Sequence, residues 1–201
     1  MATLAAWMLA GFGVLTFGVR VLVQLRTTGE TGLIGLRGGA GLADWASGVL
    51  FVGGMAMGVI SIVLVLNDSL ATIGGIDTTP VNVVGAVLAA VGGTAVFLAQ
   101  LGMGASWRIG VSDDQDTALV TTGWFSVVRN PIYSAMIVGW AGFALMVPAW
   151  LGVAAVLVIA AGLEVQVRSV EEPFLLRTHG DEYRRYATRV GRFVPGAGRF
   201  T

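Results

Sequence analysis

The sequence places a cation and a helix-starting pair directly before an apolar run. Arg129, Asn130 and Pro131 precede a stretch of mainly apolar residues. Asn is a favoured N-cap and Pro fits the first helical turn, so we expect a helix to begin here. Its free N–H groups and positive dipole end would lie beside Arg129 and suit a carboxylate or a phosphate. The alternative is an arginine that only anchors a helix at a membrane surface.

A second cluster combines a cation with two carboxylates. Arg168, Glu171 and Glu172 are spaced i, i+3 and i+4, and share a face if one helix runs through them until Pro173 limits it. Such a set can bind a zwitterion such as an amino acid, or it can form a salt-bridge cluster at a membrane surface. Glu164, one turn earlier, is either a site residue at membrane depth or a partner of Arg168.

Two tyrosines follow on a short polar segment. Tyr183 and Tyr186 are spaced i and i+3 after Gly180, and Asp181 suits the cap of a short helix there. The pair would form an aromatic wall for a planar ring, or belong to an amphipathic helix that lies on anionic lipid. His179 is the only histidine, and we expect it in a loop without a catalytic role.

The elements that position these residues are predicted to be membrane helices. Of 201 residues, 55% are hydrophobic and 12% are charged, about half the charged fraction of a soluble domain. The absence of cysteine excludes disulfides, thiol catalysis and cysteine-ligated metals. No metal-ligand spacing is visible, so we expect no metal, and a net charge of zero does not favour a nucleic-acid partner.

A membrane helix needs about 20 mainly apolar residues. The pattern predicts an all-α integral membrane protein with five transmembrane helices, the last two forming a helical hairpin before a helical cytoplasmic tail. We divide the chain into a two-helix membrane region, 1–79, and a core, 80–201. The predicted spans are Leu4–Leu25, Trp45–Leu66, Pro80–Met103, Pro131–Val147 and Ala149–Val167.

The distribution of arginines predicts the orientation. The segment 104–130 holds two arginines and the tail from Arg168 holds seven, whereas the loop 67–79 holds none. This favours an outside N-terminus and a cytoplasmic C-terminus in the plasma membrane of a bacterium. The first cation is Arg20, so we expect no cleaved signal. Gly54 and Gly58 form a GxxxG motif, which we expect to serve helix packing within the chain rather than a dimer.

Taken together, the motifs resemble the isoprenylcysteine carboxyl methyltransferase family and the related phospholipid N-methyltransferases. The resemblance covers roughly residues 100–195, and its specificity comes from the order and spacing of the motifs. The family's usual His is Asn130 here, so a role that needs imidazolium is lost. The motifs are Leu119-Val120-Thr121-Thr122-Gly123, Arg129-Asn130-Pro131-Ile132-Tyr133, Glu171-Glu172, Tyr183 with Tyr186, and Arg192 with Pro195.

The resemblance implies S-adenosylmethionine as cofactor on the cytoplasmic side. Its carboxylate suits Arg129 and the helix start, its ammonium suits one of the glutamates, and the tyrosines would line the adenosine pocket. Arg168 and Glu172 are expected to orient the acceptor or act as its base. The full set of expected cofactor-binding residues is Arg129, Asn130, Pro131, Tyr133, Glu171, Tyr183, Tyr186 and Arg192.

The expected reaction is in-line methyl transfer to a lipophilic or small apolar acceptor, whose carboxylate, amine, hydroxyl or thiol takes the methyl group. The acceptor would enter sideways between helices. Two alternatives remain. A membrane NADPH-dependent reductase of the sterol-reductase type would need more cationic contacts than one zwitterion does. A non-catalytic membrane protein, such as a transporter, would more often show repeats or broken helices.

Overall fold

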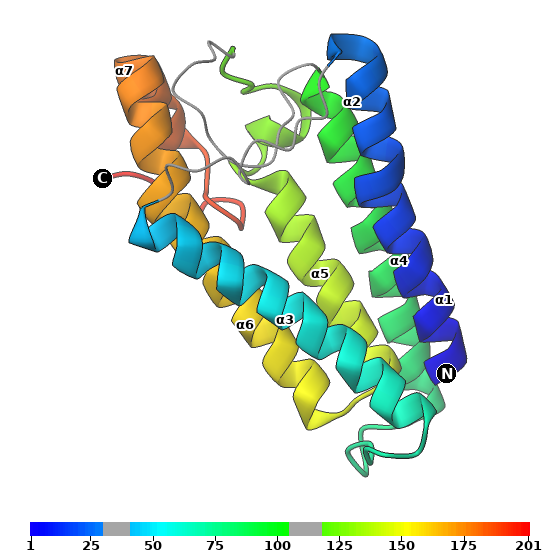
Figure 1. The fold of residues 1–201 in the computed structure, drawn as a ribbon. Coiled ribbons are helices and arrows are strands. Elements are labelled where there is room, and N and C mark those ends of the chain that lie inside the picture. The colour runs from blue at the N-terminus through cyan, green and yellow to red at the C-terminus, as the bar shows by residue number, and fades with distance from the viewer. Residues whose placement is uncertain (30–40, 105–117) are drawn as a thin grey trace.

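The computed structural model describes residues 1–29, 41–104 and 118–201, and this part of the chain is helical apart from its turns and loops. The N-terminal helix is continuous through α1, η1 and α2, and α6 continues through η4 into α7 (Figure 1). The elements are α1 (Ala2–Gly13), η1 (Val14–Val19), α2 (Arg20–Thr28), α3 (Leu42–Leu66), α4 (Thr79–Gly102), η3 (Gly123–Ser126), α5 (Pro131–Met146), α6 (Trp150–Gln166), η4 (Val167–Glu171) and α7 (Glu172–Arg189).

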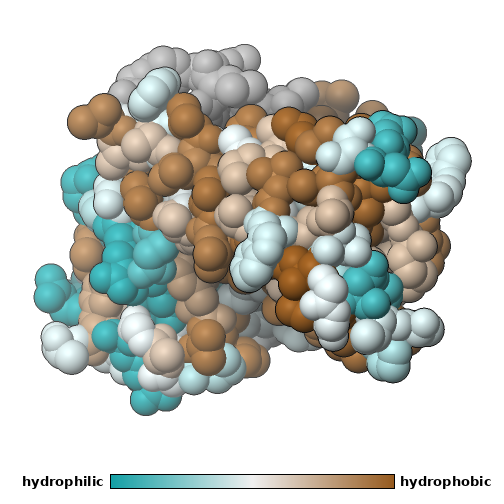
Figure 2. All heavy atoms as spheres, turned by 90° about the horizontal axis from the view of Figure 1, so that it is seen from below, coloured by the Kyte–Doolittle hydropathy of each residue, from teal (hydrophilic) through white to brown (hydrophobic). Residues whose placement is uncertain are grey.

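Four of these helical stretches are long and apolar enough to cross a membrane: Ala2–Thr28, Leu42–Leu66, Thr79–Gly102 and the helix that begins with α6. Large apolar side chains are exposed along them, and Figure 2 shows hydrophobic side chains over much of the surface at one end of the bundle. The chain is therefore an integral membrane protein. The observed ends lie within three residues of the predicted ones, except that the helix beginning with α6 continues past Val167 through η4 and α7.

Helix α5 begins at Pro131, as predicted, but it has only 16 residues. It is about 24 Å long, less than the roughly 30 Å of a hydrocarbon core. It lies between the pair α3 and α6 and the pair α1 and α4 (Figure 1). Trp140, Phe143 and Met146 are buried there, and Phe143 packs edge-on against Phe12 of α1. A fifth complete crossing stays a prediction.

Glycines let α4 and α5 approach backbone to backbone. A Cβ added at Gly142 would lie 2.3 Å from the Ala89 nitrogen, and one at Gly92 would lie 2.5 Å from the Gly139 nitrogen. Small residues allow this close packing where lipid supplies no hydrophobic force between helices. The contact fixes the position of α5, and therefore of the motif at its start.

The GxxxG motif of α3 is used inside the chain, which confirms the prediction. A Cβ at Gly54 would lie 2.7 Å from Ile159 of α6, and one at Gly58 would lie 2.4 Å from the ring of Trp140 on α5. The same side of α3 is tied to the end of α6, because the Ser47 hydroxyl donates to the Gln166 side-chain oxygen.

The tail differs from the expectation in two places. Pro173 does not limit the helix, because the wide turn η4 precedes it and the helix continues into α7. The chain instead bends sharply at Gly180, with φ 51° and ψ −123°, a conformation that favours glycine. His179 lies in α7 immediately before this bend rather than in a loop, and the short segment predicted after Gly180 is present.

We expect Gly142→Ala to destabilise the protein by about 1–3 kcal/mol, because its new methyl group would meet backbone atoms that cannot move aside. Thermal unfolding in detergent, followed by tryptophan fluorescence, measures the effect. The matched control is Gly53→Ala in α3, where a Cβ meets nothing within 4 Å. Equal unfolding temperatures for the two variants would contradict the packing described above.

Candidate active site

The segment before α5 and the segment after α7 lie side by side. The Arg129 N–H donates to the Gly191 carbonyl over 2.8 Å, and the Asn130 N–H donates to the Arg192 carbonyl over 3.1 Å. Val128 and Gly191 form a short parallel bridge. Two motifs more than 60 residues apart in the sequence therefore meet at one end of the bundle.

Asn130 occupies the N-cap position of α5 and Pro131 the first turn, as predicted, but the Asn130 side chain does not cap the helix. Its Nδ2 donates instead to the Arg192 carbonyl, 3.1 Å away. The Ser134 hydroxyl donates to the carbonyl of Phe193, so a second bond ties the start of α5 to the tail. The first-turn N–H groups of α5 are thus not capped by Asn130.

Arg129 is a buried crosslink whose side chain is 1% exposed. Its Nη1 donates to the carbonyls of Ala187 and Val190, and its Nη2 donates to the Gly198 carbonyl and to Glu172. The Phe200 ring lies 5.1 Å from the guanidinium carbon. The guanidinium thus joins both ends of α7 to the segment that follows it.

Glu172 is the centre of the buried charges, with a side chain that is 6% exposed. Arg192 binds both of its oxygens, over 2.8 and 2.9 Å, and Arg129 binds one of them over 2.6 Å. Burial would raise the pKa of Glu172, but the hydrogen bonds from Arg192 and Arg129 hold that pKa below its usual value. The group is therefore ionised at neutral pH.

Tyr183 and Tyr186 are buried beside this cluster and pack against each other with ring centroids 6.1 Å apart. The Tyr186 hydroxyl donates to the Phe125 carbonyl, and Tyr183 packs edge-on against Phe200. Both rings fill the small core between α7 and the neighbouring loops.

The three residues of the expected trio, Arg168, Glu171 and Glu172, have different side-chain partners in this structure. Glu171 accepts a hydrogen bond from the hydroxyl of Tyr133 on α5. Arg168 pairs with Glu164, and both are partly exposed. Arg192 lies 3.7 Å from Glu164 and so connects this outer pair to the buried cluster.

Sequence reasoning missed a contribution from the start of α3. Asp44 lies one turn before Ser47, whose hydroxyl is bonded to Gln166, and the Asp44 carboxylate interacts electrostatically with the Tyr133 hydroxyl. Polar residues spaced i and i+3 at the start of an apolar span were the available signal. Asp44 therefore lies close enough to Tyr133 for a weak electrostatic interaction between two helices.

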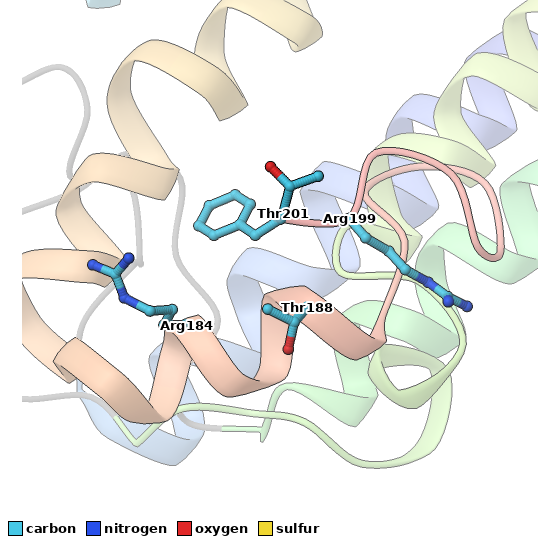
Figure 3. A pocket seen from close by; sticks show the side chains of 5 residues that line it. Arg184, Thr188, Arg199 and Thr201 are labelled. Carbon is cyan, nitrogen blue, oxygen red and sulfur yellow. The ribbon is translucent and has the colours of Figure 1, made fainter.

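Two open hollows lie on the outer face of α7, and neither was predicted. One, of about 300 Å³, is shown in Figure 3 and lined by Arg184, Thr188, Arg199, Phe200 and Thr201. The other, of about 470 Å³, is lined by Glu182, Arg185, Thr188 and Arg189. Both lie outside the cluster around Glu172.

The fold and the site define the class of the protein. It is a helical membrane protein whose polar motifs converge at one end of the bundle. The model of the phospholipid methyltransferase family matches residues 81–182, which is 102 of the 201 residues. The chain belongs to this family, which is related to the isoprenylcysteine carboxyl methyltransferases, so the resemblance is confirmed. Comparisons with curated proteins and with solved structures gave no match.

The family consists of methyltransferases, and the apolar helices make this chain a membrane methyltransferase. The matched residues run from α4 to Glu182, two residues after the bend in α7. They include Arg129, Tyr133, Glu171 and Glu172, and they end immediately before Tyr183.

We expect Glu172→Gln to destabilise the protein by about 3–5 kcal/mol, because two arginines would lose their buried counter-charge. Thermal unfolding in detergent at pH 7 measures the change. The control is Glu182→Gln on the exposed side of α7, which should change stability by less than about 1 kcal/mol. A Glu172→Gln variant as stable as the control would contradict the structural role of this carboxylate.

The lowered pKa of Glu172 also predicts that the destabilisation caused by Glu172→Gln depends on pH. Because the pKa of Glu172 is lowered in the folded protein, its stabilisation is complete above the unfolded pKa of about 4.3 and is lost as the pH falls through the folded pKa. We therefore expect the difference in unfolding temperature between the original protein and Glu172→Gln to shrink between pH 6 and pH 3. A difference that is constant with pH would contradict this assignment.

Proposed function

We propose that this membrane methyltransferase uses S-adenosylmethionine and transfers its methyl group to a lipophilic acceptor. The observation that carries the proposal is the hydrogen bond from Tyr133, in the first turn of α5, to Glu171, at the end of η4. Tyr133 lies in the same turn as the N–H groups that Asn130 does not cap. One small region thus offers a carboxylate and a positive helix end.

The chemistry of these groups fits the methionine end of the cofactor, which is a zwitterion. Glu171 would accept from its ammonium group, with Glu164 as the neighbouring carboxylate. The N–H groups after Asn130 and Pro131 would bind its carboxylate. When bound, the cofactor supplies an electrophilic methyl group on a sulfonium.

The buried residues fit a supporting role in this proposal. Arg129 and Arg192 hold Glu172, and Tyr183 and Tyr186 support them from one side. Four of these residues are expected cofactor ligands and Glu172 is the expected catalytic residue. In this proposal all five would act by fixing the start of α5 against the tail. A direct contact from Arg129 to the cofactor carboxylate would require it to exchange one of its carbonyl partners.

Arg168 remains our candidate for orienting the acceptor, because its side chain is 59% exposed at the rim of the site. An amine, hydroxyl or thiol acceptor also has to lose a proton, whereas a carboxylate does not. Since both oxygens of Glu172 are bonded to arginines, the proton would pass to Glu171 or Glu164. The lipophilic part of the acceptor would enter between helices from the bilayer.

The orientation of the chain in the membrane is a further part of the proposal, and it follows from the arginines. The end of the bundle with Arg129 would face the cytoplasm, with the N-terminus outside, in the plasma membrane of a bacterium.

Family membership favours methyl transfer over the hydride transfer of an NADPH-dependent reductase.

Calorimetric titration of the detergent-purified protein with S-adenosylmethionine, and separately with NADPH, tests the proposal. We expect saturable binding of S-adenosylmethionine only. Glu171→Gln and Tyr133→Phe should each weaken it about tenfold, the usual effect of losing one hydrogen bond to a charged group. Transfer of a labelled methyl group to an added lipid extract then reports the acceptor.

The control is Asp68→Asn, which changes an exposed carboxylate in the loop after α3 and should leave the affinity unchanged. Binding of NADPH instead would replace the proposal with a reductase. Binding of S-adenosylmethionine that is insensitive to Glu171 and Tyr133 would keep the cofactor and overturn the site.

A further inference from the structure

The arginines on the second half of α7 have no part in the site described above. Its buried face is formed by Tyr183, Tyr186 and Ala187, which pack against the protein itself. An amphipathic helix that inserts its apolar face into lipid is therefore not what the structure shows. The opposite face is exposed and basic. This face carries Arg184, Arg185 and Arg189. Together with the exposed Arg199 of the segment after α7, we call them the arginine patch.

The charge of this surface is positive in sum. The patch contributes four positive charges, and the acidic residues on the same segment, Asp181 and Glu182, contribute two negative charges, which leaves 4 − 2 = +2. Asp181 lies 3.9 Å from Arg184, and both side chains are largely exposed. Such an exposed pair is weak, so the arginines keep most of their attraction for another anion.

The hollow in Figure 3 has the donors that a phosphate needs. Arg184 and Thr188 project from α7, and Arg199 and Thr201 come from the segment that follows it. Two arginines and two threonines thus line one space of about 300 Å³, with the Arg184 and Arg199 side chains on opposite sides of it. Arginine suits phosphate because its planar fork can donate two parallel hydrogen bonds.

The position of the arginine patch along the bundle axis indicates that it lies beside lipid headgroups. Arg129 directly precedes α5, and its guanidinium binds the carbonyls of Ala187 and Val190. Thr188 and Arg189 lie between these two carbonyls in the chain. The patch is therefore level with the start of an apolar helix, where lipid headgroups lie.

Apolar residues at the same level support this placement. Trp124 and Val127, in the segment that pairs with the tail, are 50% and 52% exposed, and Val194 is 59% exposed. Exposed tryptophan is typical of the boundary between a membrane and water. Exposed apolar side chains near basic ones fit the headgroup layer of a membrane better than open solvent.

We propose that the arginine patch binds the phosphate headgroup of an anionic phospholipid at the membrane surface. Each arginine near an anionic membrane surface strengthens association about fivefold. The bound headgroup would hold α7 and the segment around Arg199 together. That segment reaches the buried cluster, because Gly198 accepts a hydrogen bond from Arg129 and Phe200 lies against the guanidinium. This surface does not depend on the proposed reaction.

Native mass spectrometry of the full chain in a neutral detergent tests the proposal by titration with phosphatidylglycerol and phosphatidylcholine. We expect phosphatidylglycerol to bind at least about tenfold more tightly. The triple variant Arg184→Gln, Arg185→Gln, Arg189→Gln should lose this preference, whereas the same three positions changed to Lys should keep most of it.

The control is Arg26→Gln, which removes an exposed arginine from the end of α2 and should leave the preference unchanged. Equal binding of the two lipids to the original protein would overturn the proposal. So would a preference that survives in the Gln variant but depends on Arg26. Displacement of phosphatidylglycerol by millimolar inorganic phosphate would assign the hollow to a soluble phosphate and overturn the lipid assignment. If the Gln variant does not fold, the comparison of the two lipids on the original protein still tests the proposal.

Discussion

The arrangement of the tail depends on the burial of three charged groups, Arg129, Glu172 and Arg192. A buried ion is costly unless its partner and its remaining hydrogen bonds are all supplied. These three residues come from the segment before α5, from the start of α7 and from the segment after α7. None of the segments can move away without leaving an unpaired charge behind. The electrostatic constraint therefore fixes the relative positions of all three.

The backbone meets this constraint through the bend at Gly180, which lets the second half of α7 approach the start of α5. The last carbonyls of a helix have no partner within that helix. Arg129 supplies a donor for these carbonyls, because its guanidinium donates to Ala187 in the last turn and to Val190 at the C-cap. A cation at a helix C-terminus also interacts favourably with the helix dipole. One side chain thus neutralises Glu172 and caps α7.

Hydropathy was enough to predict where the long helices begin and where the first three end, because the apolar length that a bilayer requires leaves few choices. It did not predict that the helix beginning with α6 continues through the polar residues of α7. The order of the motifs was enough to predict that Arg129, Glu172 and Arg192 belong to one region. Their partners could not be read in the same way. Spacing along a helix shows which residues share a side, but Glu171 takes its partner from α5 and Glu172 takes one from a segment 20 residues later. The role of Asp44 was missed because the family motifs lie elsewhere in the chain.

The charges also explain why the site lies at one end of the bundle. A charged side chain at the bilayer centre is costly, so ionised groups gather where the helices leave the membrane. At the opposite end, the described loop carries no cation, and Asp77 is held by the side chains of Thr72 and Asn82. Among the charged side chains that the structure describes, those of both signs gather at the end with Arg129. In the proposed function, the charged cofactor and the lipophilic acceptor would therefore meet at the boundary where α5 begins.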